Sequence, residues 1–485
     1  MMPAGRGGSA LHARISDTKD TAPMADGYRI ERDSLGEMQV PEDALYGAQT
    51  QRAVENFPIS GQRFGRRFIE ALGLIKKSAA LTNAELGHVD QDIADAIVAA
   101  ADQVIAGDYD DQFVLDIYQT GSGTSSNMNT NEVVSHLATE IRGDAVHPND
   151  HVNFGQSSND VIPTAIHIAA RVAIEHELVP GLEHMQAALS AKATEFDGIL
   201  KSGRTHLMDA TPVRLGQEFA GYAKQVEKGI ARVKRAADEL EELALGGTAT
   251  GTGINTHEEF SPKTIARIAA ATGIAFREAE DHFEAQAAKD AAVSTAGALN
   301  TVATSFMKIA DDIRWLGSGP TSGIHEVKLP AIQPGSSIMP GKVNPVMSEA
   351  MMMVAARVMG NHTTITVAGQ RGNFELNVMM PVLAQALLES ITLLANIAVA
   401  FTDKCLVGIE ANEARAQQLL ELNPSIATAL NPYIGYDRAA VVAKTSAKEH
   451  VSVRDIVVRE DLLPEGVDID EALDVRGMTE PGLPD

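Results

Sequence analysis

One stretch of eleven residues, from Gly335 to Pro345, combines hydroxyl, ammonium and amide side chains with glycine and proline: it reads GSSIMPGKVNP. Gly335 and Gly341 allow backbone angles that are closed to other residues, and the prolines stiffen their neighbours. The polar side chains between them are hydrogen-bond donors, the groups that hold a carboxylate. We therefore interpret this stretch as a mobile loop that closes on an anion. An ordinary surface loop has the same composition and is the alternative.

Two more polar segments stand where helices are predicted to begin. TGSGTSSNMNTNEV starts at Thr120, before a helix that we expect from near Asn129. QSSND ends at Asp160, shortly before Pro163, and proline in a first turn is a helix-start signal. Helix-start N–H groups have no intrahelical partner and bind anions. A plain N-cap box is the alternative for the first segment.

Three further segments complete the polar set: HPND at 147–150, SGRTHLMDATP at 202–212 and GGTATGTGINTH at 246–257. The last is rich in Gly and Thr but matches neither the P-loop nor the dinucleotide-binding pattern. An isolated histidine such as His147 is more often a structural hydrogen-bonding residue than a catalyst. The segments have no metal-ligand spacing such as HExxH or CxxC, so we expect no metal and no cofactor.

The polar segments share one chemical profile, which consists of hydroxyls, amides, one lysine, one arginine and one well-placed histidine. Such groups bind carboxylates and transfer protons. The reaction that fits them is elimination or addition beside a carboxylate. Removal of an acidified C–H proton then builds negative charge that fixed donors can stabilise.

Long helices must position these segments. One apolar stripe steps alternately by three and four residues, the pattern of a helix in a near-parallel bundle: Leu299, Val302, Phe306, Ile309, Ile313 and Leu316. Comparable stripes occur at 215–233 and 383–401. Pro180 is expected to kink the helix that begins at Pro163. Helices of this length and alanine content favour bundles formed by several subunits.

We divide the chain into four segments. Residues 1–27 are expected to be a disordered tail, and translation starting at Met24 is one hypothesis for it. The three domains that follow are an N-terminal domain (28–154), a central helical bundle (155–410) with the loop at 335–347, and a small C-terminal helical domain (411–485).

The composition restricts the class of partner. The chain has 485 residues and a formal net charge of −25, which argues against nucleic acid and anionic membranes as partners. It contains no run of about eighteen apolar residues, so no transmembrane helix is expected. Cys405 is the single cysteine, which excludes a disulfide framework and favours a reducing cytosol. An anionic substrate must be attracted locally, by a few placed cations and N–H groups.

The order of residues in GSSxMPxKxNP is the signature of the fumarase/aspartase superfamily, which the chain resembles from about Tyr28 to Tyr436. Within the superfamily it is similar to the class II fumarases, because aspartases usually carry Gln at the position of His206 and Ala at that of Gly341. Further segments that share this similarity are GAQTQR at 47–52, GGTATGTGINTH at 246–257, GNFELN at 372–377 and GIEAN at 408–412.

This resemblance implies a mainly α fold of three domains, whose long central helices assemble into a tetrameric helical core. It implies reversible hydration of fumarate to (S)-malate in the citric acid cycle, through an aci-carboxylate intermediate and without a cofactor. Each site is then shared between subunits of a cytoplasmic homotetramer. Ammonia elimination from aspartate, or a related fumarate-releasing reaction, is the alternative, and a catalytically silent structural relative is a further one.

The resemblance also assigns catalytic roles by position. Ser336 corresponds to the base that removes the C3 proton of malate, and nearby N–H groups and Lys342 must activate its weakly basic hydroxyl. Lys342 and Asn344 resemble the pair that holds the substrate carboxylate and steadies the intermediate. His206 corresponds to the residue that protonates the departing hydroxide through a water, and Glu349 to the carboxylate that orients it.

The remaining assignments concern binding. The residues that resemble binders of substrate and water are Ser122, Gly123, Thr124, Ser157, Ser158, Asn159, Thr205, Ser337 and Val343. The family's secondary dicarboxylate site corresponds to His147, Pro148, Asn149 and Asp150. Two departures from the pattern lie nearby: His151 stands where aspartate is usual, and Met208 where glutamine is commoner. Met208 makes the neighbourhood of the site less polar.

Overall fold

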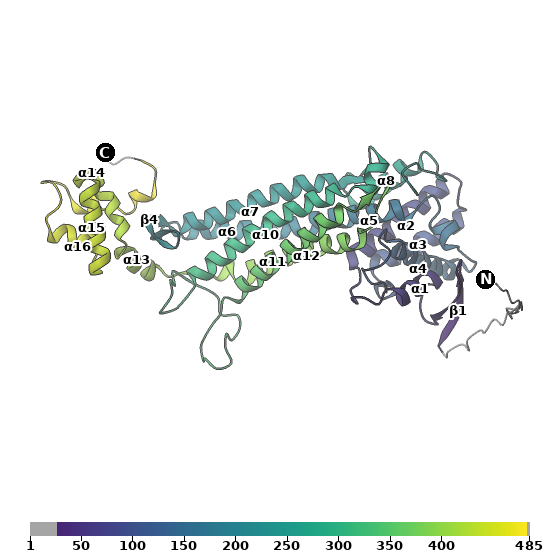
Figure 1. Ribbon diagram of the computed structural model, residues 1–485, viewed down its shortest axis with the longest axis horizontal. Helices are drawn as coiled ribbons and strands as arrows, with labels where there is room; N and C mark the ends of the chain where they lie inside the picture. Colours follow the sequence, from purple (N-terminus) through teal and green to yellow (C-terminus); the bar gives the residue numbers. More distant parts are fainter. Residues whose placement is uncertain (1–26, 483–485) are drawn as a thin grey trace, which may run out of the picture.

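The molecule is elongated, with a bundle of long helices at its centre and a smaller helical part at each end (Figure 1). The computed structural model describes residues 27–482, so the hypothetical start at Met24 and all of the predicted tail except Gly27 lie outside the described residues. The mainly α fold predicted from the sequence is confirmed. Assembly into a tetramer stays a prediction.

The N-terminal part combines one hairpin with four helices. β1 (Tyr28–Asp33) pairs antiparallel with β2 (Gly36–Pro41). The helices that follow are α1 (Ala48–Asn56), α2 (Arg66–Glu85), α3 (Gln91–Ala106) and α4 (Thr124–Arg142), with single turns at Asp110–Gln112 and Pro148–Val152. α3 packs against α2 and α4 around buried side chains such as Ile97, Val133 and Val134.

The central part is the long bundle. Its helices are α5 (Ser158–Ala173), α6 (Val179–Glu195), α7 (Leu215–Ala237), α10 (Asp290–Leu316), α11 (Val346–Gly369) and α12 (Met380–Lys404). α6 packs against α7, and α10 packs against α7, α11 and α12. The connections contain α8 (Phe260–Thr272), α9 (His282–Ala287) and the strands β3 (Leu200–Thr205), β4 (Met208–Arg214), β5 (Glu242–Leu243), β6 (Arg277–Glu278), β7 (Val327–Lys328), β8 (Gly372–Asn373) and β9 (Leu376–Asn377).

The C-terminal part is a small group of short helices. They are α13 (Glu413–Glu421), α14 (Asn431–Ile434), α15 (Tyr436–Glu449), α16 (Val453–Arg459) and α17 (Ile469–Ala472). Leu430, Val442 and Ile456 belong to its separate buried cluster. The strand β10 (Glu410–Ala411) pairs with β7 and connects this part to the bundle. Three buried clusters thus follow one another along the chain, and the exact domain limits stay a prediction.

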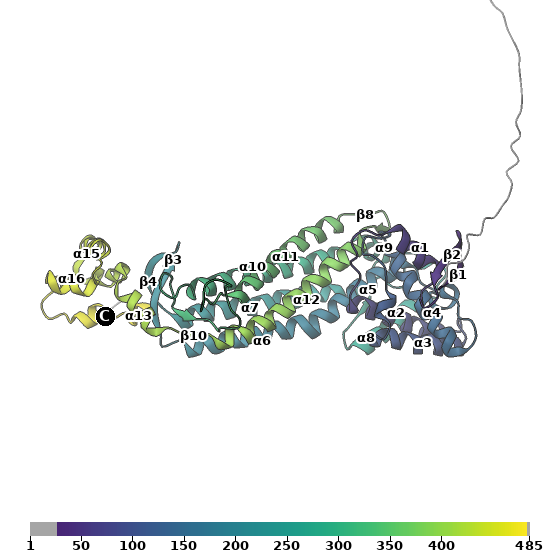
Figure 2. The same cartoon turned by 90° about the horizontal axis from the view of Figure 1, so that it is seen from below.

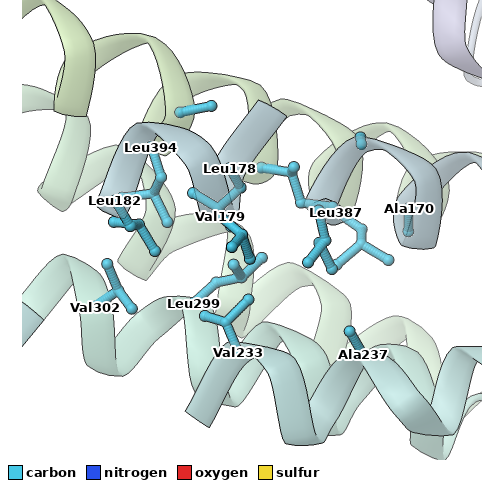
Figure 3. Close-up of a cluster of buried hydrophobic side chains, with 14 of the residues drawn as sticks. Ala170, Leu178, Val179, Leu182, Val233, Ala237, Leu299, Val302, Leu387 and Leu394 are labelled. Carbon is cyan, nitrogen blue, oxygen red and sulfur yellow. The ribbon is translucent and has the colours of Figure 1, made fainter. Parts of the chain in front are cut away.

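Apolar side chains fill the centre of the bundle. Figure 3 shows Leu299 and Val302 of α10 facing Leu182 of α6 and Leu394 of α12. The predicted stripe on α10 is buried along its whole length, because Leu299 is 0% exposed and even the last member, Leu316, is 6% exposed. The stripes at 215–233 and 383–401 are buried in the same way.

Two helices begin earlier than the sequence predicts. The helix expected near Asn129 begins at Thr124, because Gly123 adopts a left-handed φ of 73° and turns the chain directly into the helix. The helix expected at Pro163 begins at Ser158. A capping box between Ser157 and Asp160 starts this helix, and Pro163 lies inside it.

The helix around Pro180 departs from regular α geometry just before the proline. Residues Ile174–Leu178 form a single π-helical turn between α5 and α6, and Pro180 stands in the first turn of α6. Proline has no N–H to donate and its ring crowds the preceding turn, so a wider turn relieves the clash. The predicted irregularity at Pro180 therefore takes the form of a π turn.

α12 and the turn after it are long and apolar enough to cross a membrane, judged by length and composition alone. More than half of the apolar window is buried inside the protein. α12 packs against α5, α6, α10 and α11, and Leu383, Leu387 and Ile391 are completely buried there. These contacts make α12 the core helix of the bundle.

Truncation of Leu387 to alanine is expected to destabilise the bundle. The side chain is 0% exposed and sits among apolar neighbours (Figure 3), so Leu387→Ala should lower the free energy of unfolding by about 2–5 kcal/mol. Urea denaturation followed by circular dichroism measures the loss. Val441→Ala is the control, because Val441 is 60% exposed on α15; an equal loss in both variants would contradict the assignment of Leu387 to the core.

Candidate active site

Hydroxyl groups from the starts of α4 and α5 converge on one another. Ser122 Oγ lies 2.7 Å from Thr124 Oγ1, and Thr124 Oγ1 lies 2.7 Å from Ser158 Oγ. Gly123 is the N-cap of α4 and supplies no side chain to cap it. A Cβ atom at Gly123 would lie 2.9 Å from two carbons of Ile162, so only glycine allows α4 to approach α5 this closely. The structure therefore brings Ser122, Gly123, Thr124 and Ser158 together.

Ser157 and Asn159 are engaged by the protein itself. Ser157 Oγ accepts a hydrogen bond from the Asn159 N–H at 3.2 Å, so Ser157 caps α5. The Asn159 side chain donates to the carbonyl of Ala249 at 2.8 Å and thereby contacts the Gly/Thr-rich segment 246–257. Ser157 acts here as a capping residue, while Asn159 remains half-exposed beside the converging hydroxyls.

Asp160 connects α5 to the same Gly/Thr-rich segment, and sequence reasoning missed it. Its carboxylate is 0% exposed and accepts from the N–H groups of Ser157, Gly246 and Thr248 at 2.9, 2.9 and 3.0 Å. Burial raises the pKa of Asp160, and the three N–H donors oppose this by stabilising the carboxylate. The capping-box pattern S-x-x-D at 157–160 was the available signal.

A buried lysine lies behind these helix starts and was also missed. Lys76 on α2 is 0% exposed, and its Nζ donates to the amide oxygens of Asn127, Asn153 and Gln156 at 2.9, 3.0 and 2.9 Å. Burial lowers the pKa of Lys76 to about 7. The signal in the sequence was a lysine inside the apolar run LGLIKKSAA, on the same helix face as Leu72.

His206 lies at the tip of a hairpin that the sequence did not predict. β3 and β4 pair antiparallel up to Thr205 and Met208, and His206 and Leu207 form the turn with φ of 58° and 62°. Two positive φ values suit the tight turns of hairpins. Thr205, His206 and Met208 are exposed at this tip.

Buried charges along β3 hold this hairpin in place. Glu326 is 0% exposed, and its two carboxylate oxygens each accept from Arg204 at 2.9 Å. Lys201, also 0% exposed, lies 3.3 Å from Glu326 and 2.7 Å from Glu218. The bidentate bond to Glu326 fixes Arg204 two residues before His206. Arg204 thus has a structural role, which its place in the GRTH motif did not reveal.

The loop at 335–347 is closed at its base by two hydrogen bonds. The Gly335 N–H donates to the Lys342 carbonyl at 2.8 Å, and the Asn344 side chain donates to the Gly335 carbonyl at 2.7 Å. Gly341 has the left-handed φ of 78° that its glycine predicted. Ser337, Lys342 and Val343 are exposed on the loop. Asn344 therefore shapes the loop, and its second amide N–H is the one that can face a ligand.

Two backbone N–H groups point at the Ser336 hydroxyl. Ile338 and Met339 donate to Ser336 Oγ at 3.3 and 3.1 Å. Donors of this kind stabilise negative charge on the oxygen more than they stabilise the neutral hydroxyl. The loop thus provides the nearby N–H groups that Ser336 would need in order to act as a base.

Glu349 lies in the first turn of α11, where it is exposed. Within residues 27–482 no hydrogen bond or ion pair joins Glu349 to His206. The proposed orientation of His206 by Glu349 is therefore not made inside one chain.

The predicted secondary site forms part of an acidic cavity. His147 Nδ1 accepts from the N–H groups of Asn149 and Asp150 at 3.2 and 3.0 Å, so His147 caps the turn Pro148–Val152. The His147 N–H donates to His151 Nδ1 at 2.9 Å. A cavity of about 560 Å³ lies beside this turn, and four of its lining residues are acidic: Glu31, Asp33, Glu132 and Glu140. Arg29 pairs with Glu31 and Arg52 with Asp33, so these carboxylates are partly neutralised, and the secondary site stays a prediction.

The candidate residues occupy three separate places in the chain. The hydroxyl cluster belongs to α4 and α5 at one end of the molecule, and the hairpin with His206 lies at the opposite end of the bundle (Figure 1). The view from below gives the same separation (Figure 2). The loop with Ser336 precedes α11. One copy of the chain therefore does not bring its hydroxyl cluster and its His206 together.

Within 27–482, no group of three or more His, Cys, Asp or Glu side chains is arranged to hold a metal ion. The expectation that the reaction needs no metal and no cofactor stays a prediction.

Comparisons with known families cover most of the chain. Residues 36–360 match the family described as Lyase, and residues 426–480 match the family described as Fumarase C C-terminus. A relative from Halobacterium salinarum, named fumarate hydratase class II, is 56% identical over 95% of this chain and 99% of its own. One of the same name from Mycobacterium tuberculosis is 52% identical over 93% of this chain and 96% of its own.

Solved structures agree with these sequence matches. The class II fumarase from Schistosoma mansoni superposes with a TM-score of 0.90 at 38% identity, covering 93% of this chain and 99% of that one. A fumarate lyase:delta crystallin from Brucella melitensis, bound to cobalt, gives a TM-score of 0.89 at 40% identity, covering 94% of this chain and 100% of that one.

Removal of Glu326 is expected to destabilise the hairpin strongly. Glu326→Ala leaves Arg204 and the fully buried Lys201 without their shared carboxylate, and breaking a buried pair in this way costs about 3–5 kcal/mol. Urea denaturation measures the loss. Glu37→Ala is the control, because Glu37 pairs with Arg32 at the surface. If Glu326→Ala lowers the free energy of unfolding no more than the control does, the charges of Glu326, Arg204 and Lys201 do not stabilise the fold.

Proposed function

We infer that the chain, which belongs to the class II fumarate hydratase family, catalyses the reversible hydration of fumarate to (S)-malate. The observation that carries this function is the 56% identity to a relative of that name over 95% of the chain. The substrate is a dicarboxylate, and the converging hydroxyls, the exposed Lys342 and the exposed His206 are groups suited to it.

Ser336 is the proposed base. In the dehydration direction, its ionised oxygen takes the C3 proton of malate, and the electron pair of that C–H bond moves into the adjacent carboxylate, which becomes the aci-carboxylate intermediate. A serine hydroxyl is too weak a base unaided. The N–H groups of Ile338 and Met339, at 3.3 and 3.1 Å from Oγ, support this role because they stabilise the ionised oxygen.

Lys342 and Asn344 hold the carboxylate on which this charge develops. Lys342 is exposed on the same loop as Ser336, so its ammonium can reach a ligand without breaking an existing contact of the loop's base. The Lys342 ammonium stabilises the intermediate more than it stabilises the bound substrate, because the carboxylate gains an electron pair in the intermediate. Ser337 and Val343 complete the contact surface of the loop.

His206 supplies the proton that the departing hydroxide needs. In the second step the C2–O bond breaks, the intermediate becomes fumarate, and His206 donates its proton through a water to the leaving oxygen. Its exposed position at the hairpin tip leaves the imidazole free to face another surface. Glu349 of a neighbouring copy is then the carboxylate that orients it, and Thr205 lies beside it as a substrate contact.

The start of α4 and α5 binds the other substrate carboxylate. Ser122, Thr124 and Ser158 present hydroxyls at 2.7 Å spacing. N–H groups in the first turn of α4 add donors, although that of Ser126 already donates to Gln119 Oε1 at 3.0 Å. Asn159 is the proposed contact to the reacting water. Ser157, which caps α5, has a supporting role in this arrangement.

The separation of these residues supports a homotetramer with shared sites. The hydroxyl cluster and the hairpin with His206 lie at opposite ends of the bundle (Figure 1), so we propose that different copies supply them. Exposed apolar side chains along the bundle give such an assembly a surface to bury: Trp315 is 44% exposed on α10, Met353 68% on α11 and Val399 41% on α12. We place the enzyme in the cytoplasm, where the single buried Cys405 stays reduced.

The function is tested by following the ultraviolet absorbance of fumarate with the purified protein, with and without a chelator. Malate should produce fumarate, and chelation should leave the rate unchanged. Absence of any absorbance change would contradict the proposed reaction. Release of ammonia from aspartate, without malate formation from fumarate, would replace it with the ammonia-lyase reaction.

Loss of Ser336 or His206 is expected to reduce turnover without affecting the fold. Ser336→Ala and His206→Asn should each lower kcat by about 10²–10⁴-fold, because each removes one proton-transfer group. Asparagine is chosen for His206 because it tolerates the positive φ there. Ser337→Ala is the matched comparison for the loop, and a larger loss there than in Ser336→Ala would contradict the assignment of the base.

Mixing the two inactive variants tests whether sites are shared. Ser336→Ala and His206→Asn chains are combined, dissociated and reassembled. If the loop and the hairpin of one site come from different copies, roughly a quarter of the sites then combine a native loop with a native hairpin. Activity should return in the mixture, while each variant treated alone stays inactive. No recovery, with tetramers shown to be mixed, would contradict sites that take the loop and the hairpin from different copies.

A further inference from the structure

Lys76 is a buried cation for which the mechanism above has no role. It lies on the apolar face of α2, beside Leu72, Ile75 and Ala79, which are also buried. A charge in such surroundings is costly unless it is paired with an opposite charge or fully hydrogen-bonded. Within residues 27–482 no carboxylate forms an ion pair with Lys76, since all three of its hydrogen-bond partners are neutral amides.

The three amides belong to three segments that meet at the substrate-binding helix starts. Asn127 lies in the first turn of α4, one turn after Gly123. Asn153 follows the turn Pro148–Val152. Gln156 directly precedes Ser157, the N-cap of α5. One ammonium group therefore connects the start of α4 with the start of α5 from behind.

The hydrogen bonds favour the charged form of this lysine. Burial lowers the pKa of Lys76 to about 7. An ammonium group has three N–H donors, and the three amide oxygens at 2.9–3.0 Å accept all of them. A neutral amine would direct its lone pair at one of those oxygens. An anion bound nearby shifts the balance further toward the ammonium.

Its positive charge is not cancelled by a contact ion pair. Asp160 on α5 is the carboxylate that acts on Lys76 through space, and its own oxygens are occupied by the N–H groups of Ser157, Gly246 and Thr248. Asp160 offsets part of the charge of Lys76 but forms no contact pair with it, and Asn127 and Gln156 connect the ammonium to the helix starts where Thr124 and Ser158 present their hydroxyls. In a protein of net charge −25, a local positive field is what a dianionic substrate requires.

We propose that Lys76 is a positioning residue for the substrate: its buried charge, held by Asn127, Asn153 and Gln156, fixes the starts of α4 and α5 and attracts the substrate carboxylate bound between them. The inference rests on the proposed function, because it needs a dicarboxylate at this place. Lys76 takes no part in proton transfer, so its effect belongs to substrate binding and not to the chemical step.

The test compares Lys76→Met with the native enzyme. Methionine has a side chain of similar length and apolar character to the aliphatic part of lysine, but it carries no charge. KM for fumarate should rise roughly tenfold or more, with kcat changed much less, and the Kd of the unreactive dianion succinate, measured by calorimetry, should rise in parallel. Lys192→Met is the matched control: Lys192 is also buried, at 8% exposure, but it lies in the last turn of α6, where it donates to the carbonyl of Ile409 and pairs with Glu195.

A second variant separates charge from structural support. Asn127→Asp keeps a hydrogen-bond acceptor for Lys76 but cancels its charge with a contact ion pair, so KM and the Kd of succinate should rise here too. A native KM in Asn127→Asp overturns the proposal, even if Lys76→Met fails to fold. A fall in kcat at unchanged KM in Lys76→Met also overturns it. If the unmutated protein does not hydrate fumarate, the proposed function is refuted. In that case, weaker binding of succinate to the two variants than to the unmutated protein would still support a dianion site near Lys76.

Discussion

Apolar packing along the central helices determines where every polar segment of this molecule can lie. α10 contributes an uninterrupted buried stripe that packs against α7, α11 and α12. Because this core is close-packed, it acts as a rigid spacer between the hydroxyl cluster at one end and the hairpin at the other. The polar segments are connections between these helices, so their separation is a property of the core and cannot be changed by a local rearrangement of loops.

Buried charges then hold each polar segment at its end of the helical bundle. At the hairpin, Glu326 binds Arg204 and Lys201, and at the helix starts Asp160 and Lys76 hold neighbouring segments through amides and N–H groups. The two arrangements differ in one respect. The charges at the hairpin form contact ion pairs, whereas Lys76 has only neutral partners. In a strongly acidic protein, Lys76 is thereby a buried cation whose charge no contact ion pair neutralises.

Much of the fold was predictable, and the candidate site was predictable only in part. The stripe on α10 identified a bundle because burial imposes the helical period on the sequence. The start of α4 was predicted late, because Gly123 caps the helix through its backbone angle and the following Thr and Ser residues are typical of loops. The hairpin at 200–214 was missed because buried charges hold it and its residues do not alternate in polarity. Local sequence patterns identify which segments bind anions, but the distance between segments depends on the whole bundle, and the roles of Ser336 and His206 stay predictions.

The hydroxyl cluster and the hairpin stand at opposite ends of the bundle, and sites shared between copies, as proposed above, would separate folding from activity. With sites built by several copies, a single chain can reach its native structure, keep its core intact and still possess no working site. Activity then reports how many complete assemblies a sample contains and not how many chains are folded. In a cell that makes such an enzyme, activity rises steeply at the chain concentration at which the copies assemble.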